Sequence, residues 1–100
     1  MTTLSVTQCD NELYIVASAN GMGSLEVLHM SSGYNDPVNY TVNLGSILTA
    51  GTYSLTMVGI NWGGPAAFVV TIDGTPYQYN NGSAPVGAVW TQTVSVNVSR

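Results

Sequence analysis

Polar and aromatic residues gather in stretches of the sequence that have the composition of loops. Trp62 and Asn61 lie in Asn-Trp-Gly-Gly-Pro, and Tyr34, Asn35 and Asp36 lie in Ser-Ser-Gly-Tyr-Asn-Asp-Pro. An aromatic ring can stack on the apolar face of a sugar, while amide and carboxylate groups can hydrogen-bond its hydroxyls. These five residues are therefore predicted to contact a carbohydrate.

Trp62 has a second interpretation, because tryptophan is usually well buried in folded proteins. In that alternative the ring folds back over the end of the sheet and fills the core. The sequence leaves both alternatives open. Trp90 is in phase with the alternating valines Val94, Val96 and Val98 and is predicted to lie in the core.

A third stretch, residues 73–83, is rich in oxygen atoms that could bind a hard metal ion. It holds the carboxylate of Asp73, the side-chain amides of Asn80 and Asn81, and several backbone carbonyls. Calcium takes about six to eight such oxygen ligands. The alternative is that these residues only form turns, because Asp-Gly and Asn-Gly are common in loops.

Catalysis is not predicted from the titratable residues. His29 is the only histidine, and no nucleophile-elbow motif accompanies it. Cys9 is the only cysteine, so an internal disulfide is excluded, and the residue is expected to act as a small apolar residue near a strand end. No pair among the acidic residues has a spacing that suggests acid–base work; they are Asp10, Glu12, Glu26, Asp36 and Asp73.

Two alternating runs, 52–60 and 66–73, are predicted to form an antiparallel hairpin at the centre of a β-sheet. Turn residues at Asp10-Asn11, Asn20 to Gly23 and Asp73-Gly74 separate the other runs, and the last two of these turns are each predicted to form a hairpin. These runs are 4–8, 12–18, 24–31, 38–44, 77–79 and 90–98. About seven or eight short strands with turns between them are typical of a β-sandwich. The predicted fold is an all-β, antiparallel, jelly-roll-like sandwich in a single domain, 1–100.

Composition excludes several classes of partner. The chain has 100 residues, of which 45% are hydrophobic and 6% charged, and its net charge is −4 with a single basic side chain, Arg100. Such a surface offers no footprint for nucleic acid, and no apolar run is long enough to span a membrane. Low charge instead suits a self-associating or glycan-facing protein, so a homo-oligomer is expected.

The last third of the chain resembles the bacterial calcium-dependent galactose-binding lectins of the PA-IL type. Asp73 is followed seven and eight positions later by Asn80 and Asn81, and Ser95-Val96-Asn97 lies in the last strand. The resemblance implies a small jelly-roll sandwich that binds a sugar. It also implies calcium ligation by Asp73, Asn80, Asn81 and the backbone carbonyl of Tyr77.

Together these observations predict a non-enzymatic carbohydrate-binding protein that can depend on calcium. One alternative is a structural or self-assembling β-sandwich without a small-molecule ligand. Another is a targeting subunit of a toxin or adhesin. The N-terminal residues lack the basic and apolar regions of a secretory signal, so three alternatives stay open: unconventional export, a signal already removed, or a protein that stays inside the cell.

Overall fold

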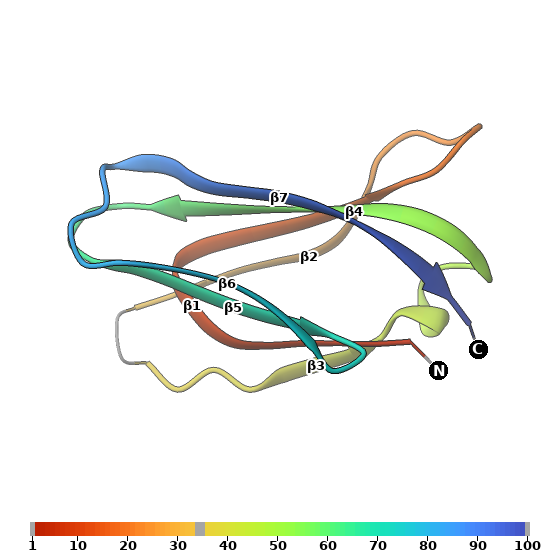
Figure 1. The fold of residues 1–100 in the computed structure, drawn as a ribbon, viewed down its shortest axis with the longest axis horizontal. Helices are drawn as coiled ribbons and strands as arrows, with labels where there is room; N and C mark the ends of the chain where they lie inside the picture. Colours follow the sequence, from red (N-terminus) through yellow and green to blue (C-terminus); the bar gives the residue numbers. More distant parts are fainter. Residues whose placement is uncertain (1, 34–35, 100) are drawn as a thin grey trace.

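The computed structural model describes residues 2–33 and 36–99. In these residues seven antiparallel strands form one curled sheet, a half-barrel (Figure 1). The predicted all-β fold and antiparallel pairing are confirmed, whereas a jelly-roll arrangement is not established by the strand pairing. The strands are β1 (Thr3–Ser18), β2 (Leu25–Ser32), β3 (Tyr40–Asn43), β4 (Gly51–Asn61), β5 (Ala66–Ile72), β6 (Thr75–Asn81) and β7 (Gly87–Val98).

Strand β1 belongs to both halves of the curled sheet. Its first part pairs with β3 and β5, and its second part pairs with β2 and β4. The change of partners falls at Asp10-Asn11, and Figure 1 shows β1 bending from the lower half of the sheet to the upper half. The predicted turn at Asp10-Asn11 is therefore a bend within one strand, and runs 4–8 and 12–18 are not separate strands.

The side-chain pattern of β1 shows why one strand can serve both halves. Leu4 and Val6 are buried at even positions, whereas Leu13 and Ile15 are buried at odd positions. A register shift between Val6 and Gln8 in the pairing with β5 inserts the extra residue that changes the phase. A bulge of this kind bends the strand and moves the buried set by one residue.

The predicted central hairpin of 52–60 with 66–73 is wrong. The strand order is β6-β5-β1-β4-β7, so β1 lies between β4 and β5 and hydrogen-bonds to both. The segment 62–65 instead carries the chain from one half of the sheet to the other. Two other predicted hairpins are confirmed: β1 pairs with β2 across Asn20 to Gly23, and β5 pairs with β6 across Asp73-Gly74.

The β5–β6 turn has the backbone that its two residues predict. Asp73 has φ 46° and Gly74 has φ 84°. Positive φ at both central residues is what a tight two-residue hairpin needs, and Asp-Gly supplies it at low cost. The turn therefore fixes β6 alongside β5 as an extended strand.

The core lies between the two halves of the curled sheet. Phe68 on β5 stacks on Trp90 on β7, with ring centroids 5.8 Å apart and an interplanar angle of 15°. Gly59 on β4 faces the same ring, because a Cβ atom there would lie 2.6 Å from Cε2 of Phe68. The two halves thus touch around Phe68, and the predicted burial of Trp90 is confirmed.

One short helical turn, η1 (Leu44–Ser46), connects β3 to β4. The side chain of Asn43 caps it by accepting a hydrogen bond of 3.0 Å from the backbone N–H of Gly45. Leu44 is fully buried and anchors the turn to the core. Within the described ranges, no helix has the length and apolar character needed to cross a membrane.

Candidate functional site

Three aromatic side chains surround one carboxylate on the outer surface of the sheet. The group comprises Glu12 and Tyr14 from β1, His29 from β2 and Trp62 from the bend that follows β4. We call these four residues the aromatic platform. Of the four, only Trp62 is among the residues that the sequence predicted to contact a sugar.

Strand alternation turns the β1 and β2 members of the platform outward. Leu13 on β1 is buried in the core, so its neighbours Glu12 and Tyr14 project from the opposite face. His29 lies directly opposite Tyr14 in the β1–β2 register. The two rings stack with centroids 4.1 Å apart and an interplanar angle of 11°, so they present one flat unit.

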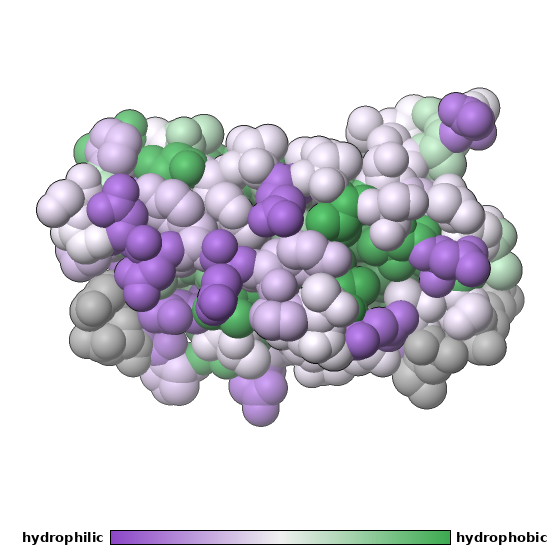
Figure 2. Space-filling view, viewed as in Figure 1, coloured by the Kyte–Doolittle hydropathy of each residue, from purple (hydrophilic) through white to green (hydrophobic). Residues whose placement is uncertain are grey.

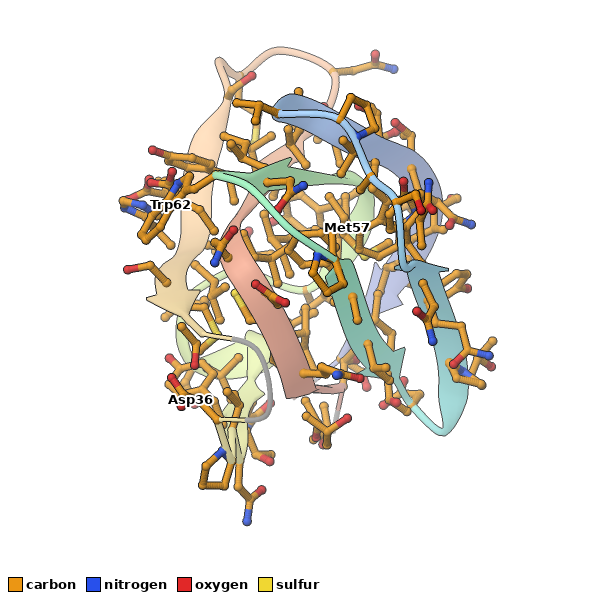
Figure 3. All side chains as sticks on the ribbon, turned by 90° about the vertical axis from the view of Figure 1, so that its left-hand side faces the viewer. Asp36, Met57 and Trp62 are labelled. Atoms are coloured by element: carbon orange, nitrogen blue, oxygen red, sulfur yellow. The ribbon has the colours of Figure 1, made fainter. Side chains whose placement is uncertain are left out.

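Trp62 is held beside this unit by two hydrogen bonds. Its indole Nε1 donates to Oε1 of Glu12 at 3.2 Å, and its backbone N–H donates to Oδ1 of Asn11 at 2.7 Å. The residue is 58% exposed, and Figure 3 shows it on the outside of the molecule, away from Met57 in the interior. The alternative in which Trp62 fills the core is therefore excluded.

Glu12 is the centre of the platform's hydrogen bonding. Besides the indole, its Oε2 accepts from Nε2 of His29 at 2.8 Å and from the hydroxyl of Tyr14 at 3.0 Å. These bonds, that from His29 first, hold the pKa of Glu12 below its ordinary value. The same carboxylate raises the pKa of the Tyr14 hydroxyl. The platform therefore carries an ionised carboxylate and a protonated phenol at neutral pH.

Asn61 has a structural role that differs from the predicted sugar contact. Its side chain is fully buried, and its Nδ2 donates to three backbone carbonyls, those of Gly64 at 2.9 Å, Pro85 at 3.0 Å and Ala84 at 3.2 Å. Its Oδ1 accepts from the backbone N–H of Gly63 at 3.2 Å. Asn61 thus joins the bend around Trp62 to the loop before β7, with no group left for a ligand.

The remaining predicted sugar contacts lie on the segment between β2 and β3. Tyr34 and Asn35 lie outside the described residues. Asp36 is exposed, and its Oδ2 accepts from the backbone N–H of Gly33 at 2.8 Å and from Oγ of Ser32 at 3.3 Å. In Figure 3 Asp36 lies on the same side of the molecule as Trp62 but well below it. Asp36 therefore closes a turn and has no contact with the aromatic platform.

The four predicted calcium ligands are not brought together. Asp73 lies in the turn before β6 and Asn81 ends the strand, and the five extended steps from Thr75 to Asn80 alone span roughly 16 Å. Oδ1 of Asp73 accepts from the backbone N–H of Thr3 at 2.8 Å, so this carboxylate fastens the start of β1. Tyr77 lies half-buried in the middle of β6. The predicted ligand loop is corrected to a strand, because the Asp-Gly turn commits the chain to pairing with β5.

Other features give weaker candidates for a site. In residues 2–33 and 36–99 no group of three or more His, Cys, Asp and Glu side chains could hold a metal ion. An open hollow of about 390 Å³ lies beside the start of β4, lined by residues 18–20 and 52–54. Its one aromatic residue, Tyr53, is 7% exposed, and its hydroxyl bonds to Thr49. The hollow therefore lacks the presented rings of the platform.

Sequence reasoning missed three of the four platform residues, although a signal for them is present. The Asn20 to Gly23 turn brings Tyr14 close to His29, and a register shift between Ile15 and Val16 makes the two residues direct partners. Glu12 lies two residues before Tyr14 and so shares its face. The reach of Trp62 to Glu12 could not be foreseen, because it depends on β4 lying next to β1.

Comparison with known proteins identifies no relative for this chain. Neither the protein-family models, nor the curated proteins, nor the solved structures contain a match. The resemblance to the PA-IL-type lectins therefore stays a prediction that rests on residues 73–97.

Proposed function

We propose that this protein binds carbohydrate through the aromatic platform and catalyses no reaction. The observation that supports this most strongly is the arrangement around Glu12, whose carboxylate fixes three aromatic side chains on one exposed surface. Side chains that are already fixed lose little conformational entropy when a ligand binds. Fixed, exposed rings are therefore suited to recognition.

The chemistry of the platform matches that of a sugar. The exposed Trp62 ring and the stacked Tyr14–His29 pair offer apolar faces for the C–H side of a pyranose. The side chains of His29 and Glu12 remain 42% and 20% exposed, so their polar atoms are within reach of hydroxyl groups. Such contacts are each worth on the order of 1 kcal/mol. A single platform would bind weakly, and repetition in a homo-oligomer would raise the avidity.

Two finer features belong to the same proposal. The halves of the curled sheet act as the layers of a small sandwich, which the contact of Phe68 with Trp90 and Gly59 supports. Calcium dependence follows only from the lectin resemblance, since Asp73 and Asn80 lie far apart. The platform requires no metal in its own hydrogen bonding.

Self-assembly without a small-molecule ligand is the second candidate function. The specific observation in its favour is the absence of charged residues from the whole of edge strand β7. The two functions are compatible, because β7 and the aromatic platform use different strands. A role as a targeting subunit of a toxin or adhesin would use the same sugar-binding surface.

Replacing Trp62 with alanine tests the proposed function. Wild-type protein, Trp62→Ala and Trp62→Phe are applied to an array of mono- and oligosaccharides, once with calcium and once with EDTA. We expect wild-type binding, a loss of at least about tenfold in Trp62→Ala, and a smaller loss in Trp62→Phe, which keeps a ring but not the indole N–H. Because Trp62 is largely exposed, the melting temperature should stay close to that of the wild type.

The control is Tyr53→Phe, which removes a hydroxyl beside the polar hollow and leaves the platform intact. This variant should bind the array as the wild type does. Equal binding by wild type and Trp62→Ala, or a wild type that binds no sugar on the array, would overturn the proposal. Binding that EDTA abolishes would show that calcium is needed as well.

A further inference from the structure

The curled sheet has four edge strands in its described part, and three of them carry features that discourage pairing with another chain. Strand β3 has only four residues, and β6 has Pro76 at its second position. Strand β2 carries Glu26, and its pairing with β1 contains a register shift. Short length, proline, charge and bulges are the usual protections of an exposed edge.

Strand β7 lacks short length, proline and charge, and its one irregularity is a register shift near Val89 in its pairing with β4. It is 12 residues long, hydrogen-bonds to β4 on one side only, and contains no charged residue and no proline. None of the five acidic residues of the chain lies on β7 or on its neighbour β4. A long uncharged edge presents unpaired N–H and C=O groups to any strand that can approach it.

The side chains of β7 suit a second strand on both faces. Thr91, Thr93 and Ser95 are exposed on the outer face. Oγ1 of Thr93 lies 3.0 Å from Oγ1 of Thr56 on β4, so a hydroxyl pair already crosses the boundary between β7 and β4. On the other face Val94 is only half-buried, and Figure 2 shows hydrophobic surface between β7 and β6. A further strand would continue the hydroxyl row and cover apolar surface.

The C-terminal end of the β7 edge is already occupied. Oγ1 of Thr2 donates to the backbone carbonyl of Asn97 at 3.3 Å and accepts from the backbone N–H of Ser99 at 2.9 Å. The length open to a new strand is therefore confined to residues 87–95. The regular part of this stretch, 90–95, lies beyond the register shift near Val89 and matches a typical strand of about five or six residues.

We propose that β7 pairs antiparallel with β7 of a second copy of this chain across a two-fold axis. The two half-barrels then share one continuous sheet. An antiparallel pair of identical strands is self-complementary here, since outward hydroxyls meet outward hydroxyls and no like charges oppose each other. The inference is independent of sugar binding, because residues 87–95 contain no platform residue.

The oligomeric state of the full chain tests this interface. We expect a mass of twice 10.5 kDa in sedimentation and light scattering, together with slowed hydrogen exchange of the amides in 87–95 as the concentration rises. Thr93→Lys places a charge on the outer face of the free edge, within the stretch that pairs. We expect it to weaken dimerisation by at least about tenfold, since a lysine on an edge strand discourages pairing with another chain.

Thr56→Lys is the matched control, because it adds the same charge and breaks the same Thr56–Thr93 hydrogen bond one strand inside the edge. It should dimerise as the wild type does. A wild-type mass of 10.5 kDa at the highest soluble concentration would overturn the proposal. So would equal weakening by Thr56→Lys and Thr93→Lys, or concentration-dependent protection in β2 or β6 in place of β7.

Discussion

Two carboxylates two residues apart on β1 lie in opposite environments. Glu12 is at the surface and accepts hydrogen bonds from His29, Tyr14 and Trp62. Asp10 is 1% exposed, and its Oδ2 finds no hydrogen-bond partner among residues 2–33 and 36–99. Residues two apart on a regular strand share a face, so this difference shows that the strand is irregular between them.

The pKa shifts of the two carboxylates follow from that placement. Burial, and then the charge of Asp36, raise the pKa of Asp10, whereas hydrogen bonds lower the pKa of Glu12. The change of strand partners at Asp10-Asn11 separates the two groups. The bend in β1 thus creates an enclosed polar corner on one side and the aromatic platform on the other.

The largest expected effect concerns the reactivity of the Cys9 thiol, which lies next to Asp10 in the enclosed polar corner. Burial first, and then the charges of Asp10 and Glu12, raise the pKa of its thiol from 9.0 to about 12. Because the thiolate is the reactive form, alkylation near neutral pH should be about 1,000-fold slower than for an unperturbed thiol, from the three-unit rise in pKa. Iodoacetamide labelling followed by mass spectrometry measures this rate. The same chain unfolded in denaturant is the control, and comparable rates in both states would show that the corner is open.

Glu12→Gln probes the exposed side of the comparison. Glutamine has one acceptor oxygen and cannot accept from all three donors, so the platform should loosen and sugar binding should weaken roughly tenfold. A readout that needs no sugar is the titration of Tyr14, whose pKa should fall back toward 10.0, because its hydrogen bond to Glu12 is the main cause of the rise. Glu26→Gln on β2 is the control for charge. An unchanged Tyr14 titration in Glu12→Gln would contradict the assigned hydrogen bonds.

The sequence predicts where the strands of this fold lie better than it predicts which strands pair with each other. Alternation places the strands and identifies the buried side of most of them, because a pleated strand with one apolar face is a local pattern. The Asp73-Gly74 and Asn20 to Gly23 hairpins are correct for the same reason, since turn chemistry is local. The order of β4, β1 and β5 is not local. It depends on a strand long enough to cross both halves, and the turn residues at Asp10-Asn11 concealed that length.

In the candidate site, too, local features could be predicted and features that depend on long-range packing could not. Trp62 could be selected from its loop, although only the structure shows it to be exposed. Asn61 has the polarity of a sugar contact, and its burial beneath the loop that precedes β7 depends on long-range packing. The sequence spacing of Asp73 and Asn80 fits a pair of calcium ligands, but the extended strand between the two residues holds them apart. Spacing along a chain indicates a site only where the backbone between the residues folds back.

Asp10→Asn is expected to have the smallest effect of these changes. It should raise the free energy of unfolding at neutral pH by about 1 kcal/mol. The folded-state pKa of Asp10 lies above the ordinary value of 3.8, so the folded protein binds this proton more tightly than the unfolded chain does. Ionised Asp10 therefore destabilises the fold once the pH rises through that raised pKa, and an uncharged amide of the same shape should relieve the cost. Chemical denaturation at several pH values measures the difference.

The pH dependence distinguishes a buried charge from a change in packing. Well below pH 3.8 Asp10 is protonated in both states, so the advantage of Asp10→Asn over the wild type should vanish there. Glu12 does not disturb this comparison, because its own loss of stabilisation in acid is common to both proteins. Asp36→Asn should show a smaller gain with the same sign, since the Asp36 charge is the lesser cause of the shift. If the free energies of unfolding of Asp10→Asn and the wild type differed by the same amount at every pH, the cost of Asp10 would come from its shape and not from its charge. The contrast between Asp10 and Glu12 would then not be electrostatic.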